Sequence, residues 1–118
     1  MRYLISLGML LAMPLAVAGE VDVVDARITK SGDQTYRADV TLRHADTGWD
    51  HYADKWDVVA PDGSVLGTRI LYHPHVDEQP FTRSLSGIRI PDGIPHVTIR
   101  AHDKVHGYQG KTLQLELP

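Results

Sequence analysis

The sequence of 118 residues contains no cysteine. Within these residues this excludes disulfide bonds, thiolate metal ligands and a cysteine nucleophile. The three methionines are Met1, Met9 and Met13, so the rest of the chain has no sulfur ligand of any kind. With a single phenylalanine and two tryptophans, the core must be built mainly from aliphatic side chains.

Net charge is also small, at −3 with histidine neutral, and no block of like charges is present. Nucleic acids and anionic membranes attract basic patches, so neither is a predicted partner. Catalytic motifs are scarce as well, since there is no G-x-S-x-G elbow and no phosphate-binding glycine loop. Ser84 and Ser86 lie on a predicted strand, which leaves a Ser–His hydrolase as a distant alternative. We therefore predict that the protein is not an enzyme.

The first residues have the pattern of a signal peptide. Arg2 supplies a positive charge, Leu4–Val17 is almost wholly apolar, and Ala16-Val17-Ala18 fits the small-x-small cleavage rule. The apolar run is shorter than the roughly 20 residues that span a bilayer, although a retained membrane anchor is the alternative. We expect residues 1–18 to be a signal peptide and 19–118 an exported domain that is free of the membrane after cleavage. Export without disulfides favours a periplasmic or secreted protein.

Alternating apolar and polar residues indicate a series of short β-strands with no sustained helical period. Thr35–His44 is the clearest strand, because Ala38, Val40 and Leu42 alternate with polar residues. Turn residues such as those at Pro61–Ser64 separate the strands at intervals of roughly 8–12 residues. The predicted strands are Val21–Thr29, Thr35–His44, Tyr52–Ala60, Val65–Tyr72, Phe81–Ile90, His96–His102 and Lys111–Pro118.

Seven such strands predict an all-β fold, a seven-stranded antiparallel immunoglobulin- or fibronectin III-like sandwich. Trp56 lies on the third strand, where these folds often bury a tryptophan, and the absence of a cysteine pair favours the fibronectin III variety. Ser86-Gly87 predicts a bulge in the fifth strand. Another small all-β barrel is the alternative fold.

Three runs, Trp49–Pro61, Tyr72–Ser86 and Arg100–Gly107, resemble a family of small exported bacterial proteins without an established activity. The similarity extends over most of the chain after residue 18. It implies export and a single domain, and it supplies no functional residues.

Six of the seven histidines flank or occupy the loops after the second, fourth and sixth predicted strands. In an up-and-down antiparallel path these three loops lie at the same end of the domain, the end that holds the antigen loops of antibody variable domains. Only His96 falls at the other end. The six are His44, His51, His73, His75, His102 and His106.

Converging imidazoles predict a site for a divalent metal, Cu(II) or Zn(II), since both accept imidazole and carboxylate ligands. In His73-Pro74-His75 an extended backbone would direct both rings to one side. His44 and His96 are interpreted as ordinary strand-end residues. The predicted ligands are His51, His73, His75, His102 and His106, with Asp77, Glu78 and Asp103 as further ligands or as acceptors that orient the rings.

A structural role for the same histidines remains open, because loop histidines also cap turns, bind backbone carbonyls and pack on aromatic rings. The sequence thus predicts a non-catalytic periplasmic binding module with a His-rich end, acting in metal handling. The alternative is a protein–protein interaction module without metal. In that case Trp49 and Tyr52 would line a partner site, although half-buried core packing is the competing role for both.

Overall fold

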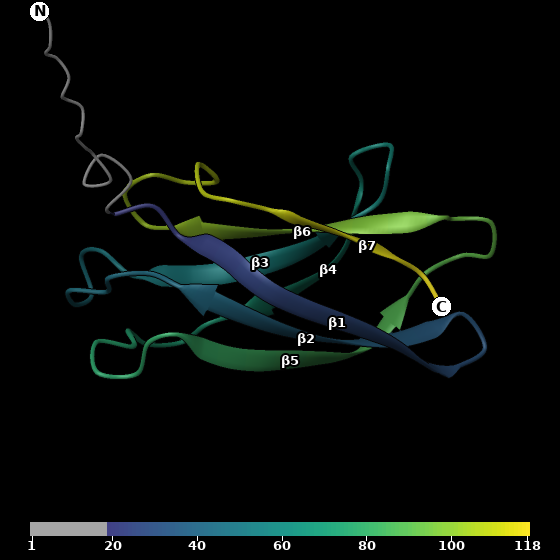
Figure 1. Cartoon of the computed structure of the whole chain (residues 1–118), viewed down its shortest axis with the longest axis horizontal. Coiled ribbons are helices and arrows are strands. Elements are labelled where there is room, and N and C mark those ends of the chain that lie inside the picture. Colours follow the sequence, from purple (N-terminus) through teal and green to yellow (C-terminus); the bar gives the residue numbers. More distant parts are fainter. Residues whose placement is uncertain (1–18) are drawn as a thin grey trace, which may run out of the picture.

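A computed structural model describes residues 19–118, and the predicted signal peptide, residues 1–18, lies outside the described residues. Seven strands form two antiparallel sheets, which confirms the all-β prediction (Figure 1). The sheet orders are β1-β2-β5 and β4-β3-β6-β7. No helix in residues 19–118 is long and apolar enough to cross a membrane. The strands are β1 (Asp22–Gly32), β2 (Thr35–Arg43), β3 (Ala53–Val59), β4 (Val65–Ile70), β5 (Phe81–Arg89), β6 (His96–Asp103) and β7 (Leu113–Glu116).

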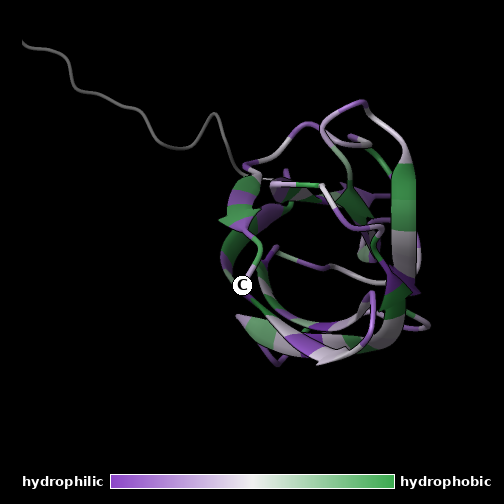
Figure 2. Ribbon diagram, turned by 90° about the vertical axis from the view of Figure 1, so that its right-hand side faces the viewer, coloured by the Kyte–Doolittle hydropathy of each residue, from purple (hydrophilic) through white to green (hydrophobic). Residues whose placement is uncertain are grey.

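The core lies between the two sheets and is almost wholly aliphatic. Side chains of β2 alternate strictly, and Ala38, Val40 and Leu42 are fully buried. Viewed along the long axis, hydrophilic and hydrophobic residues alternate along the ribbons that surround this core (Figure 2). Trp56 of β3 is the largest fully buried side chain, as predicted for the third strand. Burial of a side chain of this size contributes about 2–3 kcal/mol to folding.

Two irregularities alter the simple alternation. The predicted bulge at Ser86-Gly87 is confirmed by a register shift in the β2–β5 pairing, and Gly87 has a positive φ of 69°. A second shift, in the β3–β6 pairing, lies between Ala53 and Lys55. Because of it, Ala53 and Trp56, three residues apart, both face the core.

The three histidine-bearing loops lie at one end of the molecule, as the antiparallel path requires (Figure 1). We call this the loop end, formed by residues 44–52, 71–80 and 104–112. Direct hydrogen bonds connect its parts. The amide of Lys104 donates to the carbonyl of Tyr52 at 3.1 Å, and the amide of His44 donates to Gln79 Oε1 at 2.9 Å.

A buried carboxylate holds together the outer face of the four-stranded sheet. Asp57 of β3 is only 2% exposed. Its oxygens accept hydrogen bonds from Thr68 Oγ1 at 2.6 Å, Arg100 Nε at 3.0 Å and Tyr108 Oη at 2.8 Å. Burial by itself would raise the pKa of Asp57, but these donors and the Arg100 charge outweigh it and lower that pKa. The carboxylate therefore favours the folded state while it is ionised.

Replacing this carboxylate should make folding less dependent on pH. We expect Asp57→Asn to lower the free energy of unfolding by about 2 kcal/mol at pH 7, because three donors lose a charged acceptor. The folded-state pKa is lowered, so the stabilisation is complete above the unfolded pKa of about 3.9 and is lost as pH falls through the folded pKa. Urea unfolding at pH 7 and at pH 3 measures both values, with the exposed Asp92→Asn as control. A gap between wild type and Asp57→Asn that widens at pH 3 would contradict this account.

Candidate metal centre

Asp46 is a buried carboxylate that connects two of the loops at the loop end. Its side chain is 0% exposed. Asp46 Oδ1 accepts a hydrogen bond from the amide of Ala53 at 3.1 Å, and Oδ2 accepts one from the amide of His75 at 2.7 Å. The same Oδ1 binds Nδ1 of His44. Residues 44–53 and residue 75 are thus held to a single side chain.

The contact with Asp46 fixes the orientation of the His44 ring. With Nδ1 bound to the carboxylate, Nε2 points to Gly19, whose carbonyl oxygen lies 2.8 Å away. The side chain of His44 is fully buried, as is that of Asp103, whose Oδ2 lies 3.9 Å from His44 Nε2. A histidine held in this way by a carboxylate is the usual arrangement of a metal-binding imidazole.

Asp103 ends β6 with its side chain pointing inward. Oδ1 accepts hydrogen bonds from the amides of Val105 at 2.9 Å and His106 at 2.6 Å, which shape the following turn. Among the described residues, Oδ2 of Asp103 is one of three buried side-chain polar atoms without a hydrogen-bond partner. Since buried carboxylate oxygens are nearly always bound, this oxygen is free to take a cation or a proton.

Two further imidazoles approach Asp103 from neighbouring loops. His51 Nε2 lies 3.3 Å from Asp103 Oδ1 and 3.2 Å from His44 Nε2. His106 Nδ1 lies 3.2 Å from the same carboxylate oxygen. The side chains of His51 and His106 are 20% and 34% exposed, so they form the solvent-facing side of the cluster. We call His44, His51 and Asp103, with the Gly19 carbonyl, the His–Asp cluster.

Two of the ligand-atom distances in this cluster match tetrahedral coordination, while His44 Nε2 and Asp103 Oδ2 lie farther apart, at 3.9 Å. Zinc–nitrogen bonds of about 2.0–2.1 Å place neighbouring ligand atoms about 3.3 Å apart on the edge of a tetrahedron. The two Nε2 atoms are 3.2 Å apart, and His51 Nε2 lies 3.3 Å from Asp103 Oδ1. One ligand atom from each of His44, His51 and Asp103 can be chosen so that all lie within 4.8 Å of one another. The residues present therefore fit a metal ion.

Without metal, the charges of the cluster balance one another. Burial would lower the pKa of His44, but hydrogen bonds to Asp46 and the Gly19 carbonyl and the nearby carboxylate charges outweigh it and raise that pKa. Burial would raise the pKa of Asp103, but the amides of His106 and Val105 and the imidazole charges lower it. Both His44 nitrogens face oxygen atoms, Asp46 Oδ1 and the Gly19 carbonyl oxygen, so a metal ion would have to displace a proton that Nε2 shares with that carbonyl.

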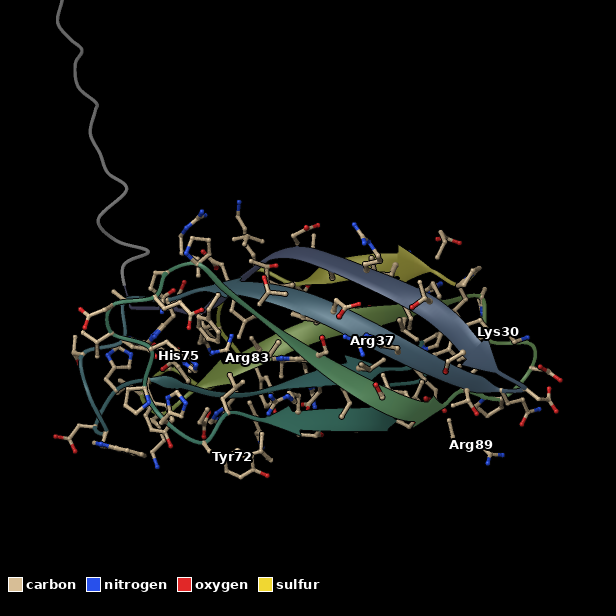
Figure 3. All side chains as sticks on the ribbon, turned by 90° about the horizontal axis from the view of Figure 1, so that it is seen from below. Lys30, Arg37, Tyr72, His75, Arg83 and Arg89 are labelled. Atoms are coloured by element: carbon tan, nitrogen blue, oxygen red, sulfur yellow. The ribbon has the colours of Figure 1, made fainter. Side chains whose placement is uncertain are left out.

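The structure separates the predicted ligands His73 and His75 from this cluster. Their rings lie 4.6 Å apart, as the His-Pro-His spacing suggests, but His73 is exposed and bonds only to the Pro74 carbonyl. His75 is 5% exposed and stacks on Phe81 at 3.9 Å. Arg83 donates to His75 Nε2 at 3.0 Å, and burial and the Arg83 charge lower the pKa of His75 (Figure 3).

His102 is also apart from the cluster, although it lies one residue from Asp103. Its Nδ1 is 2.6 Å from Asp54 Oδ1, and its ring meets the edge of Tyr108 at 4.8 Å. Successive residues of a strand point to opposite faces, so His102 lies outside the sheet while Asp103 lies inside. The five predicted histidine ligands are therefore not gathered in one place. The structure brings His51 and His106 together with Asp103, which was predicted as a further ligand.

Sequence reasoning missed His44, Asp46 and Gly19. The interpretation of His44 as an ordinary strand-end residue is wrong, since it is 2% exposed. The signal was present, because the inward series of β2 continues past Leu42 to His44 and Asp46. Other expectations also change. Trp49 is 64% exposed, which rules out core packing, while Asp77 and Glu78 are exposed and Glu78 pairs with Arg83 at 3.1 Å.

A protein of Halomicrobium mukohataei described as "Putative lipoprotein" is 41% identical to the chain over 97 residues. The match covers 82% of this chain and 47% of that protein, so the chain spans about half the length of its relative. No known protein family and no solved structure matches the chain. Lipoproteins are exported proteins, so the description of this relative agrees with the resemblance to exported proteins.

Neutralising Asp46 should loosen the loop end. We expect Asp46→Asn to lower the free energy of unfolding by about 3 kcal/mol, since a buried carboxylate with three donors is replaced by a group that can accept from fewer of them. Hydrogen exchange should accelerate most at the amides of Ala53 and His75. Asp50→Asn, in the same loop but exposed, is the matched control. Unchanged protection of both amides in Asp46→Asn would show that Asp46 does not hold the loops.

Proposed function

We propose that the protein binds a divalent metal, Zn(II) or Cu(II), through His44, His51 and Asp103. The observation that carries this proposal is the convergence of three ligand atoms within 4.8 Å, one of them from a buried carboxylate. The unpartnered Oδ2 of Asp103 supports it, because a cation would supply the missing partner. His106 lies against Asp103 and is positioned as a further ligand or as a gate to solvent.

The chemistry of the donor set selects the metal. Two imidazole nitrogens and a carboxylate oxygen suit Zn(II) and Cu(II), whereas the lack of sulfur after Met13 disfavours Cu(I). A predominantly oxygen site would suit Ca(II) or Mg(II) instead. Asp46 binds Nδ1 of His44 and thereby orients the ring, which leaves Nε2 available to the ion. The role that follows is metal holding or delivery without catalysis.

We further propose a fibronectin III-like fold and an exported location. The strand orders β1-β2-β5 and β4-β3-β6-β7 support the fold, since immunoglobulin-like domains share the pairing of their first, second and fifth strands and of their third, sixth and seventh. The signal-peptide pattern and the relative described as a lipoprotein support export. The 118 residues contain no cysteine, so they offer no thiol for lipid attachment.

Protein recognition at the same end is a second candidate function. Each of the three loops exposes a large side chain with apolar surface, and such side chains at one end of a molecule can contribute to a partner-binding surface. Trp49 is 64% exposed, Tyr72 73% and Val105 59%. Figure 3 shows Tyr72 projecting away from the body of the molecule. A module that carries metal would use such residues to meet the protein that gives or takes it.

Calorimetric titration with Zn(II) and Cu(II) tests the metal proposal. We expect a dissociation constant in the micromolar range or below, and a loss of at least about 100-fold in His51→Ala, since one of three ligands is removed. His51 is the ligand to replace because its side chain is 20% exposed, so its removal should spare the core. Zinc at 100 times its dissociation constant should stabilise the wild type by about 2.7 kcal/mol.

His102→Ala and His73→Ala are the matched controls, since His73 lies at the loop end, His102 lies beside it near the end of β6, and both are outside the cluster. Each should retain wild-type affinity. Equal binding by His51→Ala and wild type would place any metal elsewhere. A folded wild type that binds neither ion would contradict the metal proposal, and His44 would then serve as a buried counter-charge for Asp46 and Asp103. A pull-down experiment with Trp49→Ala as control would test the second candidate function, protein recognition.

A further inference from the structure

The first described residue, Gly19, is enclosed by the imidazoles of the His–Asp cluster. Its carbonyl oxygen lies 2.8 Å from His44 Nε2 and 3.0 Å from His51 Nε2. On its other side, a Cβ added to Gly19 would lie 2.8 Å from His106 Cε1. A side chain at this position would have to displace the His106 ring, and the positive φ of 102° favours glycine as well. Three histidines from two loops thus meet a single backbone unit.

Gly19 is also the residue that directly follows the predicted cleavage site Ala16-Val17-Ala18. We propose that signal-peptide removal completes the metal site, because it turns the Gly19 nitrogen into a free α-amine that joins His44, His51 and Asp103 as a ligand. This inference rests on the proposed metal function and adds the fourth ligand and its origin. The site therefore has its full set of ligands only in the processed protein.

Covalent geometry places the new amine at the cluster. Bond lengths of 1.46, 1.52 and 1.23 Å along N–Cα–C=O keep the nitrogen within about 3.6 Å of its own carbonyl oxygen. That oxygen already lies within 3.0 Å of both Nε2 atoms. Rotation about two single bonds brings amine and carbonyl onto one ion as a five-membered chelate ring. The donor set becomes nitrogen-rich, which favours Cu(II) over Zn(II).

Processing changes the chemistry of this nitrogen. Water adds across the Ala18–Gly19 peptide bond under a signal peptidase, leaving a carboxylate on Ala18 and an amine on Gly19. Before cleavage the nitrogen lone pair is delocalised into the carbonyl and is a poor donor. After cleavage the lone pair is available to a metal. The unprocessed chain therefore lacks one strong ligand and should bind the metal more weakly.

The test compares two exact N-termini. The chain is purified from an exporting host and its N-terminus is established by mass spectrometry, with Gly19 expected. A second form, cut from a fusion, retains Ala18, and the same fusion cut at Gly19 is its control. We expect the Ala18 form to bind Cu(II) at least about tenfold more weakly than both Gly19 forms. Circular dichroism should show the same strand content in all three.

Nitrogen-15 glycine provides a readout that needs no altered chain. In the Cu(II) electron paramagnetic resonance spectrum of the Gly19 form, labelling should change the hyperfine splitting of one coordinated nitrogen. Labelling should have no such effect on the Ala18 form. This spectrum decides the question even if the added residue disturbs the fold.

The outcomes separate this inference from the proposed function. Equal Cu(II) affinity in the Gly19 and Ala18 forms, abolished in both by His51→Ala, would keep the metal site and overturn the role of the amine. An unchanged spectrum of the labelled Gly19 form, or an exported chain that begins at another residue, would overturn it as well. A folded Gly19 form that binds no copper would overturn both proposals.

Discussion

The loop end depends on the burial of two carboxylates, Asp46 and Asp103. Removing an ionised carboxylate from water costs several kcal/mol unless donors and counter-charges replace the lost solvation. Asp46 meets this requirement through Ala53, His75 and His44. These partners come from two different loops, so satisfying a single side chain fixes both loops. The positions of the loops therefore follow from the cost of desolvating these carboxylates, because few backbone conformations supply all the donors that they need.

The same requirement explains why His44 is central. It lies between the two acids, and although burial would lower its pKa, the hydrogen bond to Asp46 and the charges of both carboxylates raise that pKa. A divalent cation bound at Nε2 would balance the charge of the two acids. In the proposed site, proton and metal would compete for His44 Nε2, while Asp46 would keep its contacts with His44 Nδ1 and with the start of β3.

Much of this architecture could be predicted, because it rests on period-2 patterns. The alternation that buries Val40 and Leu42 predicted the strands, and their antiparallel path predicted that the three loops lie at one end. The ligand set could not be predicted in the same way, since loop histidines have no period and His73 and His102 face solvent or another partner. Extending the period-2 patterns beyond the predicted strands would have identified the buried residues of the site. In β2 the inward-facing positions continue to His44 and Asp46, and in β6 they continue to Asp103.

Asp103 combines two roles that are normally separate. Oδ1 shapes the turn after β6 through two backbone amides, as an ordinary capping aspartate does. Oδ2 is buried without a hydrogen bond, although an asparagine could cap the same turn without burying a charge. Stability alone therefore does not account for a carboxylate here. Its second oxygen makes no hydrogen bond and lies 3.9 Å from His44 Nε2, so the proposed metal would bind between Asp103, His44 and His51.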